Sequence, residues 1–306
     1  MFKTGIKNKY DTKHVLECYA MIFLQLAGFF LITLYPILWA VKQSFYYYNG
    51  VISATRFVGF DNFITLFTKD AEYWKTWLTT FEFAIMKLPI ELPFAMLIAL
   101  LLNRKIKGKG ILRTIFFMPS IVGVAVVGLI FFNMFDYFGY INAFLVKNNI
   151  LSLGVEWFSH KWTALVVLVL GSVWCTFGTN VLYFLAALQN VPEELHEAAI
   201  IDGITKPREF FSITLPMMAP VLQTVLLLSI NGTLHTNEYI LVMTGGGPSG
   251  TTHTVMSYIV GKFVPGFAGG GVNIGYGCAV SFVTSVFMAI IALLYMKLSN
   301  KMADMY

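Results

Sequence analysis

Polar side chains inside otherwise apolar stretches are the residues of this chain best suited to chemistry. Thr224, Asn231, His235 and Glu238 follow one another at steps of seven, four and three residues. In one continuous α-helix this spacing places all four on a single face. Such a stripe of donors and acceptors suits a hydrated path or a sugar site, because sugar hydroxyls need both kinds of partner. The alternative is that these groups only join neighbouring helices.

Other polar residues within apolar runs extend the candidate path. Asn133 and Asn180 offer amides, and the indole face of Trp174 could stack on a sugar ring, although a tryptophan at mid-span also suits a core. Lys87 and Glu91 are ionisable groups four residues apart, so on a helix they can neutralise each other. We expect this pair to be structural.

The sequence predicts neither a metal site nor catalytic residues. Cys18, Cys175 and Cys278 are scattered through apolar stretches, and the histidines at 196 and 253 stand alone in polar loops. No G-x-x-x-x-G-K-[ST] phosphate-binding loop occurs in the chain. We therefore expect no cofactor to bind this chain.

The segment 190–216 is polar and carries signals for two short helices. Asn190 is the predicted cap of the first helix, and Gly203 suits the left-handed conformation that ends it. Thr205 is the predicted cap of the second helix, which Pro216 should end. Ordered helices in a connector favour a packed surface over a passive loop. That surface suits either a partner protein or the chain's own spans, and the residues alone leave both open.

This connector joins elements that composition assigns to a membrane. The chain is 57% hydrophobic and 12% charged, about half the charged fraction of soluble domains. A helix that crosses a bilayer needs about 20 mostly apolar residues. Six runs qualify: 18–41, 77–102, 114–135, 163–189, 217–240 and 274–296. The sequence therefore predicts an all-α membrane domain over 18–296.

Basic residues predict the orientation of these spans. Thirteen of the 21 Lys and Arg residues fall in the segments 1–17, 103–113, 190–216 and 297–306. Because cytoplasmic loops are enriched in Lys and Arg, these segments and both termini are predicted to be cytoplasmic. The net charge of +5 arises at the ends of apolar runs and does not indicate binding to nucleic acid.

The motif in the connector resembles that of a known family. Glu197-Ala198-Ala199, then Asp202-Gly203 and Ile-Thr-Leu-Pro216, looks like the EAA loop of permease subunits of binding-protein-dependent ABC importers. Ile204 departs from the small residue that commonly follows the glycine. The stretches 57–63 (Phe-Val-Gly-Phe-Asp-Asn-Phe) and 243–248 (Met-Thr-Gly-Gly-Gly-Pro) resemble the carbohydrate, maltose-type branch.

The resemblance implies a type I ABC importer permease in the bacterial cytoplasmic (inner) membrane. The first helix of the loop would dock on an ATPase dimer that binds ATP and Mg. Glu197 would pair with a basic residue there, Ala198 and Ala199 would permit close contact, and Gly203 would form the turn. A second permease, an extracytoplasmic solute-binding protein and a carbohydrate substrate would complete the assembly.

Three other functions stay open on sequence alone. The same loop occurs in importers of non-sugar solutes. A secondary transporter acting alone would show inverted repeats and paired broken spans, which are not evident here. An intramembrane enzyme would need a nucleophile and base at membrane depth, and Ser172 lies in no nucleophile elbow.

Overall fold

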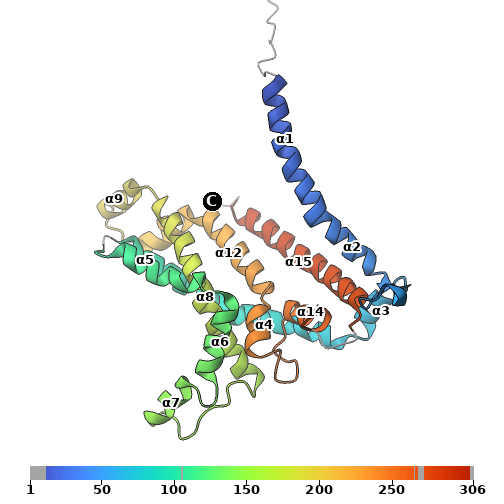
Figure 1. The fold of residues 1–306 in the computed structure, drawn as a ribbon. Helices are drawn as coiled ribbons and strands as arrows, with labels where there is room; N and C mark the ends of the chain where they lie inside the picture. Colours follow the sequence, from blue (N-terminus) through green and yellow to red (C-terminus); the bar gives the residue numbers. More distant parts are fainter. Residues whose placement is uncertain (1–11, 105, 265, 268–271, 304–306) are drawn as a thin grey trace, which may run out of the picture.

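The computed structural model describes residues 12–104, 106–264, 266–267 and 272–303, and they are mostly helical (Figure 1). The predicted N-terminal segment 1–17 and C-terminal segment 297–306 lie partly outside these residues. The first half of the chain contains α1 (Thr12–Gly28), α2 (Tyr35–Gln43), β1 (Tyr46–Tyr47), β2 (Arg56–Phe57), α3 (Asp61–Thr68), α4 (Ala71–Asn103), α5 (Lys109–Phe117), α6 (Val124–Phe135) and α7 (Tyr140–Lys147). The second half contains α8 (Lys161–Gln189), α9 (Glu193–Ile201), α10 (Lys206–Glu209), α11 (Leu215–Met217), α12 (Ala219–Leu234), α13 (Glu238–Met243), α14 (Val255–Phe263) and α15 (Ile274–Ala303).

Two long helices, α4 and α8, pack along each other and form the centre of the molecule. Phe83 and Ala95 of α4 and Leu165 and Val181 of α8 belong to one buried cluster. These buried side chains hold the two helices together, while Leu78 and Ile85 of α4 and Leu170 of α8 stay exposed on their outer sides. The helix α4 continues through its two internal prolines, which membrane helices tolerate when neighbouring groups satisfy the freed backbone carbonyls.

In the described residues, five helices are long and apolar enough to cross a membrane, and a sixth span is possible if one bent pair is counted. The predicted spans 18–41, 77–102, 163–189 and 274–296 each lie within one of these stretches. The stretch Leu16–Gln43 has no buried residues in its most apolar window and projects from the body (Figure 1).

The third predicted span, 114–135, is not one helix. The helix α5 ends at Phe117, a 3-10 turn covers Met118–Ile121, and α6 starts at Val124. Pro119 lacks a backbone donor, and its turn is held against α8 by a hydrogen bond from Ser120 Oγ to Cys175 O of 2.7 Å. Gly178 permits this contact, because a Cβ there would lie 2.3 Å from Phe116 O.

The fifth predicted span, 217–240, is also interrupted. The chain bends by 76° between Met217 and Ala219, and α12 then ends at Leu234. The prediction that Pro216 ends the second loop helix is wrong, since helical structure continues to Met217. The prediction that Glu238 shares one helical face with Thr224, Asn231 and His235 is also wrong. Glu238 begins the separate helix α13, and the carbonyl of Thr236 accepts a hydrogen bond from Thr254 Oγ1 instead of one from the helix.

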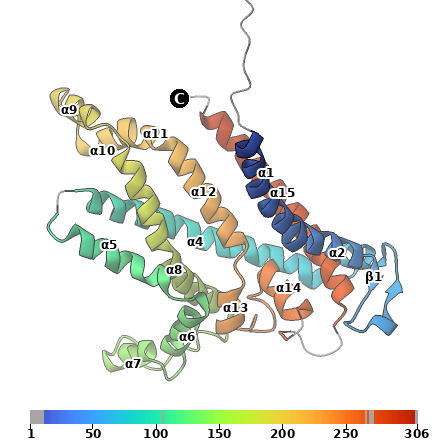
Figure 2. The same ribbon diagram turned by 45° about the horizontal axis from the view of Figure 1, so that its top comes forward.

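The connector, the start of α1 and the end of α15 share one side of the molecule. The start of α1, the end of α15 and α9 all lie toward the top of Figure 1, and Figure 2 agrees. The helix α7 lies at the opposite end of α8. This arrangement matches the expected grouping of both termini with the loop 190–216.

Candidate functional site: a polar pocket and an exposed loop helix

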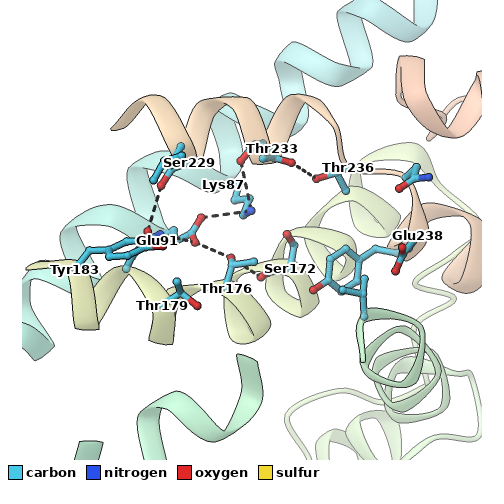
Figure 3. Close-up of a pocket in the computed structure, with 16 residues that line it drawn as sticks. Lys87, Glu91, Ser172, Thr176, Thr179, Tyr183, Ser229, Thr233, Thr236 and Glu238 are labelled. Atoms are coloured by element: carbon cyan, nitrogen blue, oxygen red, sulfur yellow. Dashed lines mark hydrogen bonds and ion pairs between the residues drawn. The ribbon is translucent and has the colours of Figure 1, made fainter. Parts of the chain in front are cut away.

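A polar pocket of about 410 Å³ lies between α4, α8, α12 and α13 (Figure 3). Most of its lining groups are hydroxyls, amides or ionisable groups from these elements. They are Lys87, Glu91, Ser172, Thr176, Thr179, Asn180, Tyr183, Ser229, Thr233, Thr236, Asn237, Glu238 and Tyr239.

Glu91 is the centre of the hydrogen-bond network in this pocket. Its Oε1 accepts from Thr176 Oγ1 at 2.6 Å and from Asn180 Nδ2 at 2.9 Å. Its Oε2 lies 3.4 Å from Lys87 Nζ, which also donates to Thr233 Oγ1 at 3.4 Å. Glu91 is 1% exposed, so the two hydrogen bonds to Oε1 replace part of its lost hydration, while Oε2 has the Lys87 ion pair and no hydrogen bond in the described chain. The network joins α4 to α8 and α12. The expected pairing of Lys87 with Glu91 is confirmed.

Two hydroxyl groups in the lining lack an oxygen or nitrogen partner among the described residues. Ser172 Oγ and Tyr239 OH are buried and form no hydrogen bond to an oxygen or nitrogen of the described chain, and the Cys175 thiol is the one weak partner near Tyr239 OH in that part of the chain. Buried polar atoms without partners are rare in folded proteins. Hydroxyls of a bound ligand could satisfy both, so the pocket can bind and orient a molecule rich in hydroxyl groups.

The structure places some of the predicted path residues at the pocket and the others elsewhere. Asn180 and Glu238 line the pocket, whereas Asn133, Trp174, Asn231 and His235 do not. The Asn133 amide donates to Leu129 O of its own helix, and Trp174 packs on Phe131 with ring centroids 6.0 Å apart.

Asn231 and His235 occupy another side of α12. Asn231 lines a small crevice between α12 and α15, and His235, at the end of α12, lines another between α14 and α15. His235 Nδ1 lies 2.8 Å from Asn231 O, so these two residues contact each other and do not face the pocket.

Sequence reasoning missed the hydroxyl residues of the pocket. Thr176 and Thr179 face it from α8, and Ser229 and Thr233 face it from α12. Serine and threonine are common in membrane helices, where they often bond to their own backbone. Their spacing of three and four residues, opposite the Lys87–Glu91 pair, is the signal that could have identified them.

The connector forms the helix α9, a glycine turn and the short helix α10. Gly203 adopts φ +67°, as predicted for a left-handed residue that ends a helix. The prediction that Asn190 caps α9 is wrong, because its N–H bonds to Ala187 O within the last turn of α8. Pro192 is the N-cap instead, and Thr205 precedes α10 as expected but forms no side-chain cap.

One side of α9 is exposed and partly apolar. Glu197 and Ala198 are exposed, and Ile200 and Ile201 are 68% and 85% exposed. Ala199 is 1% exposed, so only Ala198 of the two alanines lies on the exposed side, and the close contact expected of both stays a prediction. The helix turns Ala199 toward the chain's own core. Ile200 and Ile201 therefore add an exposed apolar surface next to Glu197 and Ala198.

The other side of α9 is fixed to α10. His196 Nδ1 lies 2.5 Å from Glu209 Oε1, and Glu209 is buried. Asp202 is exposed at the end of α9, and Pro216 is half-buried in α11. This contact sets the direction in which the exposed residues of α9 point.

The stretch 243–248 forms a tight turn against the buried side chain of His253. This turn follows α13, on the side of the molecule away from α9 (Figure 1). A Cβ at Gly246 would lie 2.0 Å from His253 Nε2, so only glycine fits there. Burial lowers the pKa of His253, Glu72 opposes this effect, and Lys262 adds to it. Nearby, the Asp70 carboxylate accepts hydrogen bonds from the hydroxyls of Tyr258 and Tyr276.

Comparison with known proteins agrees with these features. The family model described as "binding-protein-dependent transport system inner membrane component" matches residues 91–304. The probable ABC transporter permease protein YesP of Bacillus subtilis is 34% identical and covers 96% of this chain and 94% of its own length. The lactose transport system permease protein LacF of Rhizobium radiobacter is 30% identical, with 85% of this chain and 86% of that protein covered.

A solved structure shares the fold. A bacterial ABC transporter involved in the import of the acidic polysaccharide alginate has a chain that superposes with a TM-score of 0.77 at 22% identity, covering 95% of this chain and 96% of that one. The chain thus has the type I ABC importer permease fold, and it belongs to the family of inner membrane components of binding-protein-dependent transport systems.

Proposed function

We propose that this subunit is the membrane permease of an ATP-driven importer that takes up a carbohydrate delivered by an extracytoplasmic solute-binding protein. The observation that carries the carbohydrate assignment is the pocket between α4, α8 and α12. Its hydroxyls and amides suit a ligand with many hydroxyl groups, and Ser172 and Tyr239 present unpartnered hydroxyls to it. The name of the lactose permease relative supports the same class.

In this proposal, the helix α8 transmits movement of α9 to the wall of the pocket. This helix lines the pocket and runs without a break to Gln189, and α9 begins at Glu193. A partner that moves α9 therefore also displaces the α8 wall of the pocket. The α12 wall joins the connector only through the 76° bend at Met218, so the two walls can separate and expose the ligand to one side at a time.

The partners have separate surfaces in this proposal. The exposed side of α9, with Glu197 and Ala198, docks on one subunit of an ATPase dimer. ATP and Mg bind that dimer, which supplies the chemical energy. A second, different permease covers exposed spans such as Leu16–Gln43, and the solute-binding protein docks on the opposite side of the membrane.

The first experiment is to purify the tagged subunit from its native membrane in mild detergent and identify the proteins that remain bound. Recovery of an ATPase, a second permease and a solute-binding protein is expected, and the ligand of that binding protein then identifies the substrate. A non-sugar ligand would overturn the carbohydrate assignment. Transport by this chain alone, without ATP, would instead establish a secondary transporter.

A variant pair tests the pocket within the reconstituted complex. Thr176→Val with Ser229→Ala removes two pocket hydroxyls and should reduce uptake at least tenfold, about 1.4 kcal/mol of lost binding. Asn133→Ala is the control, because Asn133 lies outside the pocket and its amide bonds to Leu129 O of its own helix. Equal uptake by both variants would show that the substrate bypasses the pocket.

A further inference from the structure

A second cavity, of about 420 Å³, lies behind α9 on the side predicted to be cytoplasmic. It is open to the outside and is lined by the end of α4, the end of α8, the inner side of α9 and the start of α10. Leu188 and His196 form part of its wall. The cavity has no part in the substrate pocket, which shares none of its lining residues.

The charges around this cavity favour an anion. Arg104 and Lys206 line it, and neither side chain has an ion pair or hydrogen bond to any part of the chain that the structure describes. The single carboxylate of the lining, Glu209, is buried and already bonded to His196. Two cations are therefore free to bind an anionic group.

The level of the cavity in the membrane and its apolar wall favour an amphiphile over a small ion. Arg104 closely follows the predicted span 77–102, so we expect its guanidinium near the level of the lipid headgroups. Leu100, Leu188 and Phe210 supply an apolar wall next to the two cations. Basic pockets between membrane helices on the cytoplasmic side are suited to anionic headgroups.

We propose that this cavity binds an anionic phospholipid of the inner leaflet, with its phosphate between Arg104 and Lys206 and an acyl chain along Leu100 and Phe210. The exposed residues of α9 point away from the cavity, whereas His196 faces it. The lipid and the ATPase can thus be bound at the same time. The lipid connects α4 to α10 and steadies the helix that transmits ATP-driven motion.

The test measures lipid retention by the complete transporter, without sugar or ATP, so its result is independent of the proposed substrate. The complex is placed in phosphatidylcholine nanodiscs with increasing phosphatidylglycerol, and bound lipid is counted by native mass spectrometry. The variant Arg104→Gln/Lys206→Gln should bind phosphatidylglycerol about 30-fold more weakly, as expected for the loss of two surface cations. The variant Lys107→Gln/Lys109→Gln removes the same charge outside the cavity and should bind it normally.

Each result decides the proposal. Unchanged binding by the Arg104/Lys206 variant, or equal loss in the control, would overturn it. Displacement of phosphatidylglycerol by inorganic phosphate at millimolar concentration would show a site for free phosphate instead. Arg104→Lys with Lys206→Arg keeps both charges and should restore binding, which separates the charge effect from misfolding.

Discussion

The buried Lys87–Glu91 pair is the clearest test at the scale of single residues. Lys87→Met leaves Glu91 buried with no cation, which should lower the free energy of unfolding by about 3–5 kcal/mol. Replacing both residues by methionine should restore most of the loss, because no uncompensated charge remains. Thermal unfolding of the purified subunit in detergent measures both effects.

The pair of Lys161 with Glu82 is the matched control. Its side chains are 28% and 30% exposed, so Lys161→Met should cost at most about 1 kcal/mol. A similar cost for Lys87→Met would mean that the pocket is more accessible to water than the burial of its side chains indicates.

Sequence spacing was enough to predict the Lys87–Glu91 pair. The hydroxyls that complete its network were not predictable, because their orientation depends on how α8 and α12 face α4.

The buried side chain of His253, on the predicted outer side, should make the stability of the protein depend on pH. Burial lowers its pKa, so below about pH 6.5 the unfolded chain binds a proton that the folded chain does not. Stability is therefore full above that pH and falls as the pH is lowered. His253→Gln should remove this part of the fall, while His160→Gln, at an exposed histidine, should leave it intact. Unfolding temperatures measured between about pH 8 and 5 check this, and identical profiles for both variants would contradict it.

At the scale of elements, the two adjacent alanines of α9 should behave differently. Ala198→Leu places a larger side chain on the exposed surface and should block docking of the ATPase without changing the unfolding temperature. Ala199→Leu overpacks a site that is 1% exposed and should cost about 1–3 kcal/mol of stability. Co-purification of the ATPase and thermal unfolding of each variant separate the two effects. Loss of stability in Ala198→Leu would place that residue in the core.

The elements show where sequence reasoning succeeds and fails. Gly203 was predictable, since a left-handed turn after a polar helix leaves few alternatives to glycine. The identity of the buried alanine was not, because Ala198 and Ala199 differ only in the packing of α9 on the body. The breaks at Pro119 and at residues 235–237 fall inside apolar runs, where hydropathy does not detect a change of direction.

At the scale of the whole molecule, hydropathy predicted the fold class because lipid requires each spanning segment to satisfy its own backbone hydrogen bonds. The arrangement of the helices around a pocket was not predictable in the same way. Lys87, Thr176 and Thr233 meet from three separate helices, and nothing in their local sequence indicates that these helices are neighbours.

The membrane orientation gives the last prediction. In a chain without its three native cysteines, Leu153→Cys and Ser249→Cys lie in exposed turns of the predicted outer side, and Ile201→Cys lies on α9. A membrane-impermeant maleimide should label the first two in intact cells and label Ile201→Cys only after permeabilisation, with the subunit expressed without its partners so that α9 is uncovered. Labelling of Ile201→Cys from outside would reverse the orientation. It would also remove α9 from reach of a cytoplasmic ATPase and place the cavity beside Arg104 in the outer leaflet.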